Sequence, residues 1–200
     1  MSVLSSYGIG KSSITRTVAP DGLPVDEEEI TTYLRADSTE LKNEAKILVA
    51  RATAYVEDYQ WSQLLTATFA ERFDRFHDVI QLMKSPVQSV TSVQYVDTNG
   101  TTQTLTASTD YTADVYAKPA RIVPAYSKWW PTTRGFINDV IVTYIAGYGT
   151  AADVPLNIRQ AILMLASHWL EFHGAVDANA ANVDFSVKAL LDQNSFRTFY

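Results

Sequence analysis

The sequence predicts an α+β protein in which a small helical bundle carries an inserted antiparallel β module, with an extended segment at each terminus. Apolar residues recur at helical spacing in residues 24–62 and return at that spacing in residues 151–175. Between them, residues 63–150 contain short β-branched runs separated by turn residues. Helical spacing of apolar residues predicts α-helices, and short β-branched runs predict strands. We therefore expect the two helical segments to pack together, with the β module inserted between them in the sequence.

Composition limits the possible classes of protein. The chain has 200 residues, is 46% hydrophobic and has a net charge of −6. Its apolar content is ample for a packed core, and an acidic chain lacks the basic footprint of a protein that grips nucleic acid. With no cysteine, disulfides and thiolate metal sites are excluded. We expect no secretory signal and no membrane span, because no apolar run approaches about 18 residues.

The N-terminal part predicts an arm followed by two helices. Residues 1–23 are small and polar and contain Pro20 and Gly22, which predicts a flexible arm. Asp26 with Glu29, and Asp37 with the glutamate three residues on, match capping boxes at two helix starts. The second helix should run for about five turns, with one apolar face formed by Leu41, Ala45, Leu48, Ala52, Tyr55 and Tyr59.

Turn signals organise the rest of the chain. Asn99-Gly100 between β-rich runs predicts a hairpin, because both residues tolerate positive φ. The run from Val140 ends at Gly147-Tyr148-Gly149, and Val154-Pro155 then opens a helix. That helix should end near Gly174. Its apolar face should pack on the earlier helix, in a core that includes Leu48, Tyr55, Ile162, Leu165 and Trp169.

No catalytic, cofactor-binding or metal-binding constellation stands out. The Gly8–Ser13 segment lacks the first glycine and the preceding strand of a phosphate-binding loop. His168 and His173 are five residues apart and so point to different faces of one helix. The acidic run Asp26–Glu29 suits a helix N-terminus, and nothing marks Glu71, Asp74 and Asp78 as a catalytic pair. We therefore expect a protein that is not an enzyme and needs no cofactor.

Two segments are candidates for binding a partner. Trp129 and Trp130 are adjacent in a loop and cannot easily both face one core, so at least one should lie at an interface. Residues 176–200 are too sparsely apolar to fold alone and suit a tail that orders on a partner. The alternative is a tail that folds back on its own bundle. The candidate partner-binding residues are Phe185, Val187, Leu190, Leu191, Phe196, Arg197, Trp129 and Trp130.

The order of these signals resembles the head–tail adaptor (connector) proteins of tailed bacteriophages and gene transfer agents. Each matching piece is weakly specific, but together they keep a consistent order over residues 25–197. The pieces are Ile30 to Arg35, Ser85 to Asp97, Tyr111 to Pro124, Trp130-Pro131, Tyr144 to Gly149, Val154-Pro155 with Ile158 to Ile162, and Val187 to Leu191. The longer N-terminal arm and the aromatic C-terminus depart from the family.

The resemblance implies a structural virion protein of the neck, assembled in the host cytoplasm. It implies a ring of this chain, expected to be twelve-fold, between the portal protein and a tail-side neck or stopper protein. Genomic DNA would pass through the lumen during packaging and ejection without specific binding. Two alternatives from other classes remain: a carbohydrate-binding or enzymatic module with its site on the β face, and a cytoplasmic interaction domain. An exposed Trp or Tyr platform would mark the first of these.

Overall fold

The computed structural model describes residues 12–172 and 180–193. The described chain divides into two compact units. The β unit comprises residues 12–19 and Ala67–Gly147, and the helical unit comprises Pro20–Thr66 with residues 148–172 and 180–193. The predicted α+β class is confirmed. None of the helices in these ranges is both long and apolar enough to cross a membrane.

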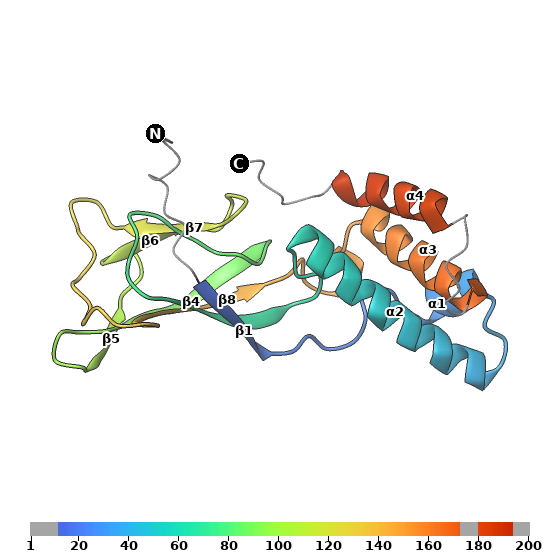
Figure 1. The fold of residues 1–200 in the computed structure, drawn as a ribbon, viewed down its shortest axis with the longest axis horizontal. Coiled ribbons are helices and arrows are strands. Elements are labelled where there is room, and N and C mark those ends of the chain that lie inside the picture. Colours follow the sequence, from blue (N-terminus) through green and yellow to red (C-terminus); the bar gives the residue numbers. More distant parts are fainter. Residues whose placement is uncertain (1–11, 173–179, 194–200) are drawn as a thin grey trace. The chain divides into compact units, whose positions relative to one another are not determined.

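The helical unit contains four α-helices and one 3₁₀ turn within the described residues (Figure 1). The α-helices are α1 (Glu27–Leu34), α2 (Thr39–Gln60), α3 (Leu156–Phe172) and α4 (Ala180–Asp192), and the 3₁₀ turn is Ala151–Asp153. α3 lies against α1, α2 and α4. The second helical segment therefore packs on the first, as the sequence predicted.

Both N-terminal helices begin at a side-chain cap. Asp26 caps α1, since its Oδ1 accepts a hydrogen bond from the Glu29 backbone N–H at 2.8 Å. The predicted cap of α2 is wrong by one residue. Ser38, rather than Asp37, holds the N-cap position, and its Oγ accepts a hydrogen bond from the Leu41 backbone N–H at 3.2 Å.

The core of the helical unit differs partly from the predicted stripe. Leu48, Ile162 and Leu165 are buried as expected. Tyr55 is 38% exposed and meets the half-buried Trp169 ring edge-on at 6.5 Å, so this pair closes the margin of the core. The α2 face that is fully buried is rotated relative to the predicted one and comprises Ala45, Leu48, Val49, Ala52 and Val56.

The β unit consists of two antiparallel sheets. The larger has the order β1-β2-β8-β4-β5, and the smaller has the order β3-β7-β6. Their bounds are β1 Ser12–Val18, β2 Ala67–Phe73, β3 Ile80–Gln81, β4 Val87–Val96, β5 Thr102–Leu105, β6 Tyr111–Asp114, β7 Arg121–Pro124 and β8 Val140–Ala146. Side chains from both sheets share one apolar cluster, as expected for two sheets that pack face to face.

Alternation along β8 shows how this core is built. Val140, Val142, Tyr144 and Ala146 are fully buried, while the three residues between them are half-buried. Because successive side chains in a strand point to opposite faces, the buried set lies between the two sheets. The Phe69 ring on the neighbouring β2 stacks on Tyr144 with ring centroids 5.9 Å apart.

Two expectations for the β region need correction. The flexible arm predicted for residues 1–23 is wrong at Ser12–Val18, which forms β1 and pairs with β2 from Ser12↔Phe73 to Val18↔Thr68. The hairpin between β4 and β5 is present, but only Gly100 has positive φ (+82°). Asn99 does not have the expected positive φ. Asp97 stabilises the turn instead, since its Oδ1 accepts hydrogen bonds from the Asn99 and Thr101 backbone N–H groups.

Candidate interaction surface

A buried carboxylate links separate segments of the β unit. The Glu71 carboxylate on β2 is fully buried and accepts three hydrogen bonds. The donors are the Ser12 hydroxyl at 2.8 Å, the Tyr144 hydroxyl at 3.0 Å and the Met83 backbone N–H at 3.1 Å. They come from β1, β8 and the segment after β3, so Glu71 ties three parts of the unit together.

Burial decides the ionisation behaviour of Glu71 and Tyr144. Desolvation raises the pKa of Glu71 above its usual value, although hydrogen bonds from Met83, Ser12 and Tyr144 act in the opposite direction. Desolvation also raises the pKa of Tyr144, and the nearby Glu71 charge adds to that effect. Tyr144 is therefore a hydrogen-bond donor at neutral pH.

A second carboxylate of this region, Asp74, also makes a structural contact. It accepts a hydrogen bond from the Asn138 backbone N–H at 3.0 Å and so holds the loop that precedes β8. No cluster of three or more His, Asp or Glu side chains suited to a metal ion occurs in the described ranges.

The two adjacent tryptophans have different environments, as their sequence position predicted. Trp130 stacks on Phe76 with ring centroids 4.6 Å apart and planes at 7°, and Phe76 meets Tyr95 edge-on. Trp129 is 92% exposed. Trp130 therefore belongs to the margin of the β core, whereas Trp129 remains the candidate for contact with a partner.

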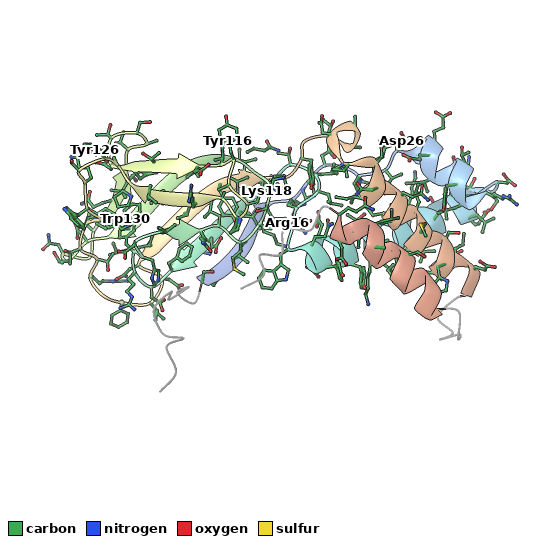
Figure 2. All side chains as sticks on the ribbon, turned by 90° about the horizontal axis from the view of Figure 1, so that it is seen from above. Arg16, Asp26, Tyr116, Lys118, Tyr126 and Trp130 are labelled. Carbon is green, nitrogen blue, oxygen red and sulfur yellow. The ribbon has the colours of Figure 1, made fainter. Side chains whose placement is uncertain are left out.

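Trp129 is one of several exposed apolar side chains on the segment that joins β7 to β8. We call residues 125–139 the aromatic loop. Four of its large side chains are mostly exposed: Tyr126 (98%), Trp129 (92%), Phe136 (67%) and Ile137 (67%). Tyr126 and Trp130 are found at the same end of the β unit (Figure 2). Clustered exposed apolar side chains are typical of interaction sites.

A buried carboxylate holds the second half of this loop. Asp139 is fully buried, and it accepts hydrogen bonds from Arg134 Nε at 2.8 Å and the Phe136 backbone N–H at 2.7 Å. Burial acts to raise the pKa of Asp139, but the hydrogen bonds from Phe136 and Arg134 outweigh it and hold that pKa below its usual value. The Arg134 backbone N–H also donates to the Val96 carbonyl at 3.1 Å.

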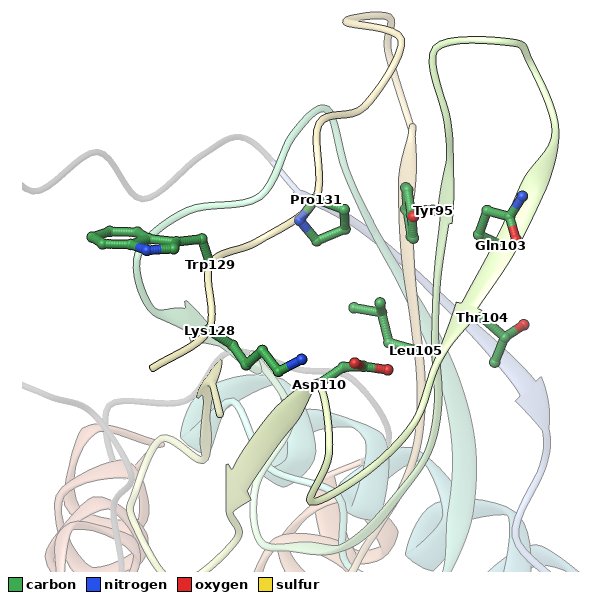
Figure 3. A pocket seen from close by; sticks show the side chains of 8 residues that line it. All are labelled: Tyr95, Gln103, Thr104, Leu105, Asp110, Lys128, Trp129 and Pro131. Carbon is green, nitrogen blue, oxygen red and sulfur yellow. The ribbon is translucent and has the colours of Figure 1, made fainter. Parts of the chain in front are cut away.

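A shallow groove of about 340 Å³ lies between the aromatic loop and the β4–β5 hairpin (Figure 3). In Figure 3 the Trp129 indole points away from the groove, while Lys128 extends toward Asp110. Pro131, Tyr95 and Leu105 form its apolar part, and the remaining lining side chains are Gln103 and Thr104. The groove is small and mixed in polarity, with Trp129 at its margin.

The C-terminal candidates fall into three groups. Val187 and Leu191 are fully buried in the core of the helical unit, and Leu190 packs against that core. The side chain of Phe185, and both Phe196 and Arg197, lie outside the described residues. For Val187 and Leu191 the structure contains the fold-back alternative, because their apolar side chains complete the bundle of this same chain.

Polar contacts hold α4 to α2 and α3. Gln60 Nε2 donates to the Leu191 carbonyl at 2.7 Å, and Asn157 Nδ2 donates to the Leu190 carbonyl at 3.2 Å. The last carbonyls of a helix lack partners within the helix, so these amides satisfy the end of α4. Tyr59 adds a hydrogen bond from its hydroxyl to Asp192 Oδ1 at 3.0 Å.

Sequence reasoning missed Tyr126, Phe136 and Ile137 as candidates. The dense group of aromatic residues around Trp129, namely Tyr126, Trp130 and Phe136, was a usable signal in the sequence. The exposure of Phe136 and Ile137 was not readable, because apolar residues of this kind more often fill a core.

These features define an α+β chain built from a small helical unit and a two-sheet β unit. The sequence matches no protein family profile and no curated protein. Solved structures share the fold. One is a chain from the neck of an empty gene transfer agent particle, computed with C6 symmetry, with a TM-score of 0.74 and 24% identity over 94% of this chain and 96% of that one.

Two further structures are similar over nearly their whole length. A chain from the virion of a native gene transfer agent particle has a TM-score of 0.74 and 21% identity, covering 94% of this chain and 97% of that one. A chain from the neck of a native particle, computed with C12 symmetry, has a TM-score of 0.66 and 22% identity, covering 94% and 96%. At these identities the similarity establishes the fold.

Proposed function

We propose that this chain is a structural protein of the neck of a tailed phage or gene transfer agent particle. In this proposal it forms the adaptor ring between the portal and a tail-side neck or stopper protein, with about twelve copies around the DNA channel. The observation that carries the proposal is the fold match to particle neck chains over almost the full length of both partners. A shared fold alone does not define a function, so the proposal needs its own test.

Features of the chain itself support a binding role. The exposed aromatic loop is a suitable surface for contact with a protein, since aromatic side chains are enriched at interfaces. The described residues of the helical unit include 14 Asp and Glu against 6 Lys and Arg, an acidic balance that suits a wall past which DNA slides without being held.

The extreme C-terminus is the proposed portal contact. Because Val187 and Leu191 are in the core of the helical unit, they are not part of this contact. We assign it to residues 194–200, with Phe196 as the apolar anchor and Arg197 as its polar neighbour. Deleting residues 194–200 should leave the unfolding temperature nearly unchanged and abolish joining to the portal. A truncated chain that joins the portal with unchanged affinity contradicts this assignment.

Omitting the chain from particle assembly tests the proposed function. Heads should fill with DNA but remain unjoined to tails, and adding the purified full-length chain should restore joining. Tails that attach normally without the chain would contradict the proposal.

A carbohydrate-binding role is a second candidate, because Trp129 and Tyr126 are exposed aromatic side chains of the kind that such a role needs. The groove beside Trp129 supplies polar side chains such as Gln103 and Asp110. Screening the purified chain against oligosaccharides by Trp fluorescence checks it. Saturable binding that disappears in Trp129→Ala would favour this role, whereas no response across the screen would exclude it for the sugars tested.

A further inference from the structure

Charge is divided unequally between the two units of the chain. Among the described residues, the helical unit carries 14 Asp and Glu against 6 Lys and Arg, and the β unit carries 7 against 8. Two helical units therefore repel each other, while a helical unit and the β unit of another copy do not. A closed ring needs a contact of this second kind, in which two different surfaces of one chain meet.

The aromatic loop supplies the apolar and basic side of such a contact. Lys128 precedes the exposed Trp129 and has no ion-pair partner within the described ranges. The Arg134 guanidinium lies 5.5 Å from the centre of the Phe136 ring. Exposed aromatic side chains are among the residue types that dominate binding energy at interfaces. Because Arg134 is paired with Asp139, Lys128 is the cation of this loop whose charge favours an acidic partner.

The first two helices of the helical unit offer a matching acidic surface. We call Glu28, Tyr33, Asp37, Glu40 and Leu41 the α1–α2 surface, and all five are exposed. Tyr33 and Leu41 are 41% and 39% exposed and supply apolar area in the same α1–α2 segment as the three carboxylates. None of these three carboxylates belongs to an ion pair within the part of the chain that the structure describes.

We infer that the aromatic loop of one copy packs on the α1–α2 surface of the next copy. The inference rests on the proposed ring and names the two surfaces that close it. Phe136 and Ile137 enter the contact already ordered, because Asp139 and Val96 hold the backbone of the loop through hydrogen bonds to Arg134 and Phe136. A preformed loop loses little conformational freedom on binding. Like-on-like pairing is disfavoured by charge at the helical units.

Cross-linking in assembled particles tests this contact, and the cysteine-free chain makes the test specific. Thr132 in the aromatic loop and Thr32 on α1 are both exposed and lie outside the proposed anchors. Particles are assembled with the full-length chain carrying Thr132→Cys and Thr32→Cys together, and then treated with a flexible bismaleimide. The inference predicts a ladder of covalently joined copies of this chain on a denaturing gel.

The two single-cysteine variants are the controls, because head-to-tail packing gives them no cross-linked chain. Absence of the chain from particles would defeat the proposed function itself. Its presence at ring copy number without a ladder in the double variant would overturn only the inference. A dimer formed by either single variant alone would also overturn it, since that product indicates like-on-like contact.

Side-chain variants in the same double-cysteine background show which residues stabilise the contact between copies. Trp129→Ala should reduce the cross-linked fraction about tenfold, whereas Tyr116→Ala, 92% exposed and outside the loop, should leave it unchanged. Lys128→Glu should weaken the ladder, and adding Glu28→Lys and Glu40→Lys should restore it.

Nucleic acid is the rival occupant of the aromatic loop. Single-stranded DNA binding lost in Trp129→Ala, with the ladder unchanged, would overturn the inference in favour of DNA.

Discussion

The Tyr144 hydroxyl donates a hydrogen bond to the buried Glu71 carboxylate at 3.0 Å, between two neighbouring strands of the larger sheet. The Tyr144 oxygen in turn accepts a hydrogen bond from the Lys84 backbone N–H at 3.3 Å. This link connects the sheet with the chain that leads into β4. A carboxylate in this position makes the stability of the β unit sensitive to pH.

Glu71→Gln should remove that pH sensitivity. Because the pKa of Glu71 is raised in the folded protein by burial, its contribution to stability is fully present below its unfolded pKa and is lost as pH rises through the folded pKa. The free energy of unfolding of the natural chain should therefore fall, relative to Glu71→Gln, as pH rises from about 4 to 7. Urea unfolding of both proteins across this range checks it. A constant difference would refute the prediction.

Asp139→Ala should loosen the aromatic loop. The change leaves the Phe136 N–H without its acceptor and frees Arg134, at a cost of about 1–3 kcal/mol in unfolding free energy. Trypsin should then cleave after Arg134 more rapidly. Asp114→Ala is the matched control, since Asp114 makes the same kind of contacts outside the loop, where it accepts hydrogen bonds from Arg121 Nε and the Tyr116 backbone N–H. Equal cleavage rates in the two variants would contradict the assigned role of Asp139.

Leu191→Ala should destabilise the helical unit by about 2–5 kcal/mol, because Leu191 is fully buried. Leu190→Ala should cost less, since Leu190 is only half-buried against the same core. Thermal unfolding of both variants makes the comparison. If Leu191→Ala shifts the unfolding temperature no more than Leu190→Ala does, then α4 does not contribute to the core as described.

The free chain should not bind DNA tightly. Its net charge of −6 opposes the phosphate contacts that supply most non-specific affinity. Fluorescence anisotropy with labelled duplex DNA at physiological salt should detect no sub-micromolar binding. Tight binding that weakens steeply as salt rises would be inconsistent with a lumen past which DNA slides.

Local pattern was enough for the elements that pair or pack with near neighbours. The alternating run at Val140 predicted β8, and the caps at Asp26 and near Asp37 predicted the helix starts within one residue. Period and turn chemistry are local properties, so a single sequence carries them.

Long-range partners were beyond that reasoning. β1 is a polar segment that forms a strand by pairing with the edge of β2, whose paired residues lie fifty or more positions along the chain. Glu71 is charged and was not expected inside, yet donors from three separate segments satisfy it there. Phe136 and Leu191 both have large apolar side chains, but Phe136 is exposed and Leu191 is buried. Only the tertiary structure distinguishes the candidate contact from the core residue.

Counting and locating the copies of this chain in purified particles decides whether it forms the proposed neck ring. Quantitative mass spectrometry gives the copy number, and a reconstruction of the neck gives the position. We expect a closed ring of many copies, about twelve, around the DNA channel between head and tail. A chain that is absent from the neck, or present there at one or two copies, would contradict it.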